Sequence, residues 1–399
     1  MIILFFLPFF MLTACEPNPP IVESPVAIVP DTGLLALKWE QPQPGSSIGV
    51  PVFNNEVVVF PNVFGSTDKL LTCFDKSDGE LLWHYGNAIL DNDDFGADPT
   101  VSLMNGIIAA CGEDQVVTID VKQGVTNWET NLGTFGAGGV RMAVIGEYIY
   151  HAHHHNYPHT EAHLVRSHYQ YGGTWDTLFS FQMVDNYELR MDAPSLHIKP
   201  NGDSLLIFRL GQFNFTLSDG RQDLIAFNLA TRAIEWRKDD FEPSGNCNVR
   251  PPTVYDSKVY VMGTYALYCF DANTGQLLWE KAEPGGLLGK VSLTIAEGKV
   301  FVKPSNSHFI AYDAQTGNLA WDVTSSTVSP NGSVYYKGHL FITGADIGIY
   351  VHRVTDGKLV YLKQMPGRND LYHPIAIDPD EGLLFTSDGK NVLCFKIDL

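Results

Sequence analysis

Histidines crowd into one short stretch of the chain. Of its 13 histidines, seven lie between residues 151 and 168: His151, His153, His154, His155, His159, His163 and His168. In an extended strand, alternate side chains share a face, and a return strand beginning near Ala162 would bring His163 close to that face. Imidazole nitrogens are ligands that suit zinc and copper. This hairpin is predicted to be either a polar surface hairpin without an ion or a Zn or Cu site with the ligands His151, His153, His155, His159 and His163.

Four basic residues stand out in an acidic chain. The chain has 45 acidic and 26 basic residues and a formal net charge of -19, which excludes general attraction to a phosphate backbone and argues against a nucleic-acid partner. Each of the four comes just before the expected first strand of a repeat unit, where together they would ring the mouth of a central channel. Either they form a patch for an anionic ligand or acidic partner, or each pairs with a nearby aspartate. These residues are Arg141, Arg190, Arg250 and Lys290.

No catalytic motif accompanies these residues. The sequence contains no phosphate-binding glycine loop, no Gly-x-Ser-x-Gly elbow and no His-Glu-x-x-His zinc-protease motif. We therefore predict no catalytic residue.

The N-terminal residues are typical of a targeting segment. Residues 1–13 are almost wholly apolar and too short to span a bilayer as a helix. The following Leu12-Thr13-Ala14-Cys15 resembles a bacterial lipobox, which implies cleavage before Cys15 and a lipid on its sulfur; an ordinary cleaved signal peptide is the alternative. We expect a signal peptide over 1–14, a stiff proline-rich tether over 15–30, and a folded domain over 31–399.

A repeated pattern organises the rest of the chain. An apolar strand, a polar turn and a strand ending in Trp recur over residues 70–83, 116–128, 224–236, 267–279 and 309–321. The aspartates of the turn can accept hydrogen bonds from turn amides, and the glycines can adopt the positive φ of a tight hairpin. The indoles are expected to pack against the neighbouring repeat as structural staples. The repeat residues are Asp75, Asp120, Asp271 and Asp313; Gly79, Gly124, Gly275 and Gly317; and Trp39, Trp83, Trp128, Trp236, Trp279 and Trp321.

The spacing of the tryptophans predicts the architecture. From Trp39 to Trp83 is 44 residues, and from Trp279 to Trp321 is 42, which matches a four-stranded propeller blade. The 108 residues from Trp128 to Trp236 fit two blades, the first near 140–181 and containing an expected strand over 144–152. Residues 374–399 supply only three strands, which the segment 34–39 can complete. The prediction is an all-β, eight-bladed propeller of four-stranded antiparallel blades, closed by an N-terminal strand, with seven blades as the alternative.

Cysteine usage agrees with a packed core. Lipidation of Cys15 would leave five of six cysteines, an odd number that excludes a complete disulfide framework. Cys73, Cys269 and Cys394 share one repeat position and are expected to be small buried core residues.

The repeat also carries a family resemblance. The Ala/Cys-aromatic-Asp-x-x-Thr-Gly-x-x-x-Trp pattern is similar to the tryptophan-docking repeat of pyrroloquinoline-quinone-type propellers, which also occurs in BamB-type outer-membrane protein assembly lipoproteins. In quinoprotein dehydrogenases, the resemblance implies a quinone and a calcium ion over the channel, beside a disulfide of two adjacent cysteines. No two cysteines are adjacent here, so neither this cofactor nor enzyme activity is expected.

We therefore expect a non-enzymatic, lipid-anchored docking scaffold for envelope proteins, on the periplasmic face of the bacterial outer membrane and BamB-like in outer-membrane protein assembly. The alternatives are a quinone- or metal-dependent oxidoreductase and a sensor that binds a small ligand or glycan through the channel and its aromatic residues.

Overall fold

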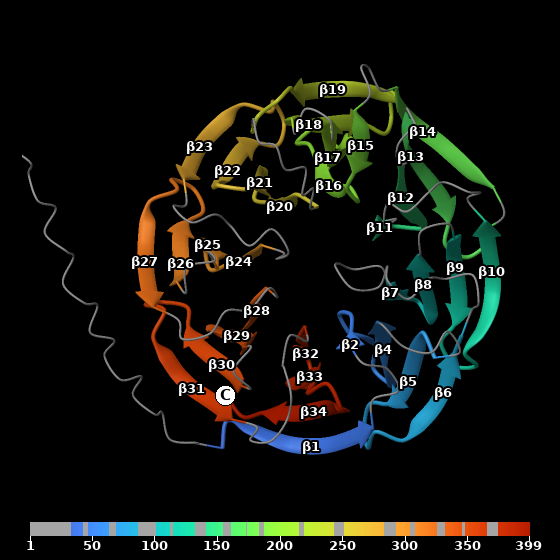
Figure 1. Cartoon of the computed structure of the whole chain (residues 1–399), viewed down its shortest axis with the longest axis vertical. Coiled ribbons are helices and arrows are strands. Elements are labelled where there is room, and N and C mark those ends of the chain that lie inside the picture. The colour runs from blue at the N-terminus through green and yellow to red at the C-terminus, as the bar shows by residue number, and fades with distance from the viewer. Residues whose placement is uncertain are drawn as a thin grey trace, which may run out of the picture.

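The protein is a closed ring of eight antiparallel β-sheets around a central axis (Figure 1). The computed structural model describes residues 33–42, 47–63, 69–86, 101–111, 115–131, 141–154, 161–172, 174–182, 187–214, 219–242, 251–282, 293–303, 308–324, 332–344, 348–364 and 374–399. Within these ranges, no helix is long and apolar enough to cross a membrane. The predicted eight-bladed propeller is confirmed.

The first four blades follow one another along the chain. Blade one contains β2 (Ser47–Ile48), β3 (Val52–Phe53), β4 (Val57–Val63), β5 (Leu71–Asp75) and β6 (Leu81–Tyr85). Blade two contains β7 (Val101–Met104), β8 (Ile107–Cys111), β9 (Gln115–Asp120) and β10 (Val125–Asn131). Blade three contains β11 (Arg141–Ile145), β12 (Tyr148–His154), β13 (Glu161–His168) and β14 (Trp175–Gln182). Blade four contains β15 (Glu188–Met191), β16 (Ser195–Ile198), β17 (Ser204–Asn214), β18 (Asp219–Asn228) and β19 (Ala233–Lys238).

The remaining blades keep the same order from the channel outward. Blade five contains β20 (Thr253–Tyr255), β21 (Lys258–Met262), β22 (Ala266–Asp271) and β23 (Leu277–Ala282). Blade six contains β24 (Thr294–Ala296), β25 (Lys299–Val302), β26 (His308–Asp313) and β27 (Leu319–Thr324). Blade seven contains β28 (Val334–Tyr336), β29 (His339–Gly344), β30 (Gly348–Arg353) and β31 (Leu359–Gln364). Blade eight contains β32 (Ala376–Asp378), β33 (Leu383–Ser387), β34 (Asn391–Ile397) and β1 (Leu35–Pro42).

Blade eight closes the ring with strands from both ends of the chain. β1 pairs antiparallel with β34, with Leu35 opposite Ile397 and Pro42 opposite Asn391. Figure 1 shows this junction at the bottom of the ring, where the blue β1 lies beside the red β34. The predicted closure by an N-terminal strand is therefore confirmed. Because the ring closes, each sheet packs between two neighbours.

Six indoles join successive blades through one repeated contact. Each Trp Nε1 donates to a backbone carbonyl in the outer turn of the next blade, over 2.8 to 3.3 Å. The pairs are Trp39 with Lys76, Trp83 with Val121, Trp128 with Tyr169, Trp236 with Ala272, Trp279 with Ala314, and Trp321 with Val354. These tryptophans are thus contacts between blades, as expected of staples.

The indole ring requires a glycine beneath it. The four predicted turn glycines have φ between 67° and 78°, and a Cβ on Gly275 would lie 2.6 Å from the ring of Trp236. The turn aspartates accept backbone amides as predicted; Oδ1 of Asp313, for example, accepts from the amides of Gln315 and Thr316. A glycine at this position therefore serves two needs, the left-handed turn and the close approach of the indole.

Blade three departs from the sequence prediction in its inner strands. The expected strand over 144–152 is wrong, because a turn at Gly146 and Glu147 divides it between β11 and β12. Its outer turn keeps the repeat geometry with other residues. His168 occupies the aspartate position, and Gly172 lies beneath the ring of Trp128.

The seam between blades three and four has no indole staple. In β14, Phe179 lies opposite the β-bulge where other blades place Trp, and its ring packs against Phe208 and Phe227. Arg232 replaces the turn glycine and keeps a positive φ of 55°. Its guanidinium binds both carboxylate oxygens of Asp176. An exposed ion pair and phenyl packing thus take the place of the indole here.

A buried ion pair strengthens the closing seam. Lys76 Nζ lies 2.8 Å from both Asp378 and Glu381, and the Lys76 side chain is only 3% exposed. Burial alone would raise the pKa of Asp378, but the hydrogen bond from Lys76 holds it below its usual range. The same Lys76 accepts the indole N–H of Trp39 at its carbonyl. Blade one therefore holds blade eight through both its backbone and its side chain.

Replacing Trp39 by Ala should open the ring at its closing seam. Trp39 is 7% exposed and Trp175 is 39% exposed, so Trp175→Ala is a matched control. We expect Trp39→Ala to lower the free energy of unfolding by about 3–5 kcal/mol and Trp175→Ala by less than about 1 kcal/mol, measured by urea denaturation. Equal losses of unfolding free energy in the two variants would contradict a structural role for the contact of Trp39 between blades eight and one.

One buried histidine makes the fold sensitive to acid. His352 is 3% exposed, and its Nδ1 lies 2.8 Å from the carbonyl oxygen of Gly357. Burial lowers the pKa of His352 to about 4. The neutral imidazole is therefore the form that the folded chain accommodates.

Stability should consequently fall as the pH drops from about 6.5 to about 4. Over that range the unfolded chain binds a proton at His352 and the folded chain does not, so this group removes about 1.4 kcal/mol per pH unit. In His352→Gln the free energy of unfolding should depend less steeply on pH across this window. Identical slopes in denaturation series at several pH values would contradict the assignment.

Candidate functional site

The two faces of the ring are built differently. Because the strands of each blade are antiparallel, the hairpin turns within its inner and outer strand pairs emerge on one face, which we call the turn face. The connections between the middle strands and between blades emerge on the opposite face, the loop face. The staples end in the turn face, so its turns are committed to holding the ring. Candidate binding residues are therefore sought on the loop face.

Two of the four predicted basic residues lie toward the loop-face ends of inner strands. Arg141 is the first residue of β11, and Arg190 lies within β15. Both were expected just before a first strand, and the structure places them inside it. Figure 1 shows β11 on the channel side of its blade. Arg250 and Lys290 lie outside the described residues, so the predicted ring of positive charge stays a prediction.

The histidine hairpin is formed by β12 and β13. Their register pairs the backbone of His153 with His163 and that of His151 with Val165. The shared face of histidines that the sequence predicts stays a prediction. His151 is fully buried, and its ring centroid lies 6.2 Å from that of Trp175. His163 is bonded to its neighbours, with Nδ1 2.8 Å from Ser180 Oγ and Nε2 3.2 Å from Glu161.

The structure describes only some of the predicted metal ligands. His155 and His159 lie outside the described residues. Among the residues that the structure describes, no group of three or more His, Cys, Asp or Glu side chains is arranged to hold a metal ion. A metal at His163 would have to displace its bonds to Ser180 and Glu161. Zinc or copper binding therefore stays a hypothesis about the whole hairpin.

Zinc titration tests this hypothesis directly. If the hairpin binds the ion, zinc should raise the melting temperature of the wild-type chain by preferential binding to the folded state. The rise should disappear in the His153→Ala/His155→Ala double variant. An equal rise in both proteins, or none in either, would contradict the site.

Blade four contributes a buried charged network that sequence patterns did not reveal. Arg209 is fully buried; it donates to the Met262 carbonyl over 2.9 Å and to Gln222 Oε1. Gln222 in turn lies 3.3 Å from Glu242. No local sequence pattern points to this network, because the partners of Arg209 are 53 and 13 residues away in the chain.

Glu242 anchors the loop between β21 and β22. Its Oε1 accepts the backbone amides of Thr264 at 2.7 Å and Tyr265 at 3.2 Å. Burial raises the pKa of Glu242. A Cβ on Gly263 would lie 2.4 Å from the carboxylate oxygens, so a larger residue there would displace the carboxylate from this position. This clamp fixes Tyr265, which is 63% exposed on the loop face.

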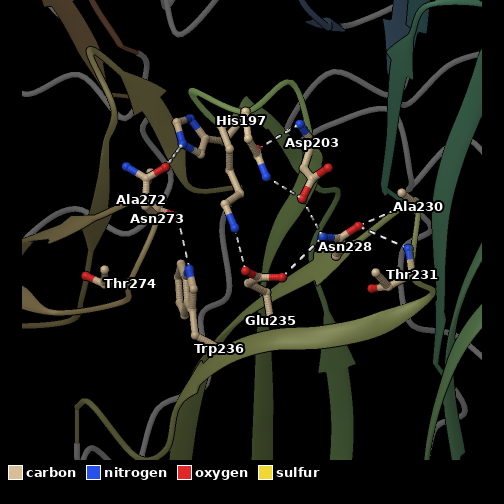
Figure 2. Close-up of polar contacts among 12 residues, drawn as sticks. His197, Asp203, Asn228, Ala230, Thr231, Glu235, Trp236, Ala272, Asn273 and Thr274 are labelled. Atoms are coloured by element: carbon tan, nitrogen blue, oxygen red, sulfur yellow. Dashed lines mark hydrogen bonds and ion pairs between the residues drawn. The ribbon is translucent and has the colours of Figure 1, made fainter.

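On the turn face, polar side chains link blade four to blade five. Figure 2 shows His197 reaching Asn273, with Nε2 and Oδ1 2.9 Å apart, and Trp236 donating to the carbonyl of Ala272. Glu235 accepts from Lys199 and Asn228, and the bond from Lys199 lowers the pKa of Glu235. His197 and Trp236 therefore link blade four to blade five, whereas the contacts of Glu235 lie within blade four.

The cysteines do not fit the quinone site of the propeller dehydrogenases. No two of the six are adjacent in the sequence. Cys73, Cys269 and Cys394 lie in core strands, where burial raises the pKa of each thiol to about 12. As predicted, these three are small buried core residues, and their thiols are protonated near neutral pH.

Comparison with known proteins identifies the family. The model of the family described as outer membrane protein assembly factor BamB matches residues 26–150 and 220–397. The chain belongs to the BamB family. BamB of Bordetella pertussis is 28% identical over 114 residues, which is 28% of either chain, so the match spans less than a third of that relative. The family model leaves out 151–219, the stretch that contains the histidine hairpin and Phe179.

Solved structures share the fold at low identity. BamB from Moraxella catarrhalis superposes with a TM-score of 0.59 at 13% identity, covering 91% of this chain and 99% of that one. The quinohemoprotein alcohol dehydrogenase from Comamonas testosteroni gives a TM-score of 0.69 at 11% identity, covering 93% and 78%. Likeness at such identities shows the fold alone. The family assignment therefore rests on the family match rather than on these superpositions.

Proposed function

We propose that this BamB-family chain is a lipid-anchored docking platform of the bacterial envelope that assists outer-membrane protein assembly. The proposal rests on the family match, which covers residues 26–150 and 220–397. We place the lipid at Cys15 and the protein at the periplasmic face of the outer membrane. Its partners would be envelope proteins, and it would catalyse no reaction.

The difference between the two faces of the ring supports a docking role for the loop face. Staples and polar links occupy the turns of the opposite face, as at Trp236 and Ala272. On the loop face, Glu242 instead holds the backbone amide of Tyr265, whose side chain is exposed. Such preorganisation lowers the entropy that binding costs. Arg141, Arg190, Arg250 and Lys290 would add attraction for an acidic partner.

Charge reversal at Arg250 tests the proposed face. We expect Arg250→Glu to abolish in-cell crosslinking of the full-length chain to envelope proteins, including β-barrel assembly proteins, because it repels an acidic partner. Its melting temperature should equal that of wild type. Capture would be measured by mass spectrometry after crosslinking.

Lys122→Glu is the matched control, because Lys122 is exposed on the turn face of blade two. This variant should retain capture. Unchanged capture by Arg250→Glu, or equal loss in both variants, would refute the proposed interface.

A further inference from the structure

The outer turn of blade three carries an exposed stack of rings. The ring of His168 stacks on Tyr171 with centroids 4.6 Å apart and on Tyr169 at 5.6 Å. Tyr148 meets His168 edge-on at 5.6 Å. Tyr171 is 73% exposed, the largest exposure among the exposed large hydrophobic residues of the described chain. We call Tyr148, His168, Tyr169 and Tyr171 the aromatic cluster.

The cluster is held in place before any ligand binds. His168 Nδ1 lies 3.1 Å from the amide of Gln170 and serves as the turn acceptor that aspartate provides in other blades. The Tyr169 carbonyl accepts the indole N–H of Trp128, and its hydroxyl accepts from Asn105 over 3.0 Å. A rigid ring loses little conformational entropy when a ligand stacks on it.

The cluster is peculiar to this turn. The residue at the position of Tyr171 is small or polar in the other outer turns: Asp78, Gln123, Thr231, Thr274, Thr316 and Asp356. Staple geometry therefore does not call for a tyrosine there. His168, Tyr169 and Tyr171 also fall within 151–219, which the family model does not match. The turn thus carries a feature that neither the fold nor the family match explains.

Polar groups surround the rings. Glu147, whose side chain is 76% exposed, lies 3.9 Å from His168 Nε2, and Gln170 and Asn105 are exposed beside the stack. A sugar ring presents an apolar C–H face to an aromatic ring and hydroxyls to such a polar rim. A membrane surface fits less well, because anionic lipids attract basic segments and this rim carries Glu147 on a chain of net charge -19.

We propose that the aromatic cluster is a saccharide-binding site in which Tyr171 is the stacking ring and Glu147, Gln170 and Asn105 bind hydroxyls. The site lies on the turn face, away from the proposed partner interface, so the two can be occupied together. Its failure would leave the proposed docking function untouched.

Calorimetric titration of the full-length chain with chitotetraose, cellotetraose and maltotetraose tests the site. At least one should bind with a Kd below about 10 mM. Tyr171→Ala should weaken binding at least about tenfold, the loss expected for one stacked ring. Tyr171→Phe should retain most of it. Tyr335→Ala is the control, because Tyr335 is also a partly exposed tyrosine of the turn face.

The proposal is overturned if none of the three saccharides binds by about 10 mM, or if Tyr171→Ala and Tyr335→Ala change the affinity equally. Binding to phosphatidylglycerol vesicles that depends on Tyr171, without saccharide binding, would instead assign the cluster to a membrane surface. Should Tyr171→Ala unfold, Tyr171→Thr, the residue found in three other turns, replaces it under the same criteria.

Discussion

The ring depends on one contact between neighbouring blades, an indole seated on a glycine turn. The indole supplies a large apolar face, and its N–H donates a hydrogen bond to a backbone carbonyl of the next blade, as Trp83 does to Val121. The turn must approach so closely that a Cβ on Gly124 would lie 2.5 Å from the ring of Trp83. This contact repeats at six of the eight seams of the ring. The pairing of β1 with β34 joins the two ends of the chain, and Trp39 on β1 then links blade eight to blade one through the same indole contact.

Because of this contact, structural residues gather on the turn face, and the candidate binding residues are sought on the loop face. The turn face is shaped by staples, turn aspartates and polar links such as that between His197 and Asn273, all of which repeat or satisfy one another. On the loop face, the connections between strands differ in length from blade to blade. A protein that keeps a scaffold constant can vary these loops without loss of stability. Blade three is the exception, because its outer turn combines a staple contact with exposed aromatic rings.

Much of the fold could be predicted from the sequence, because the staple leaves a visible trace at fixed spacing. Asp, Gly and Trp recur where the turn, the left-handed φ and the indole require them, and the unfinished last blade points to closure by the N-terminal strand. The sequence pattern does not predict the positions at which a different residue type fills the same role in the turn. His168 replaces an aspartate and Arg232 takes a positive φ without being glycine, so spacing alone could not reveal them. Contacts distant in sequence, such as that of Arg209 with Met262, leave no local pattern at all.

We propose that the loop face docks partners, whereas the turn face holds the ring. The most direct test is in-cell photo-crosslinking from two positions in blade five. A photoreactive residue would replace Tyr265, 63% exposed on the loop face, or Thr274, exposed on the turn face. If the loop face docks partners, we expect capture of envelope proteins from position 265 and none from position 274. Capture from position 274 alone, or equally from both, would contradict it.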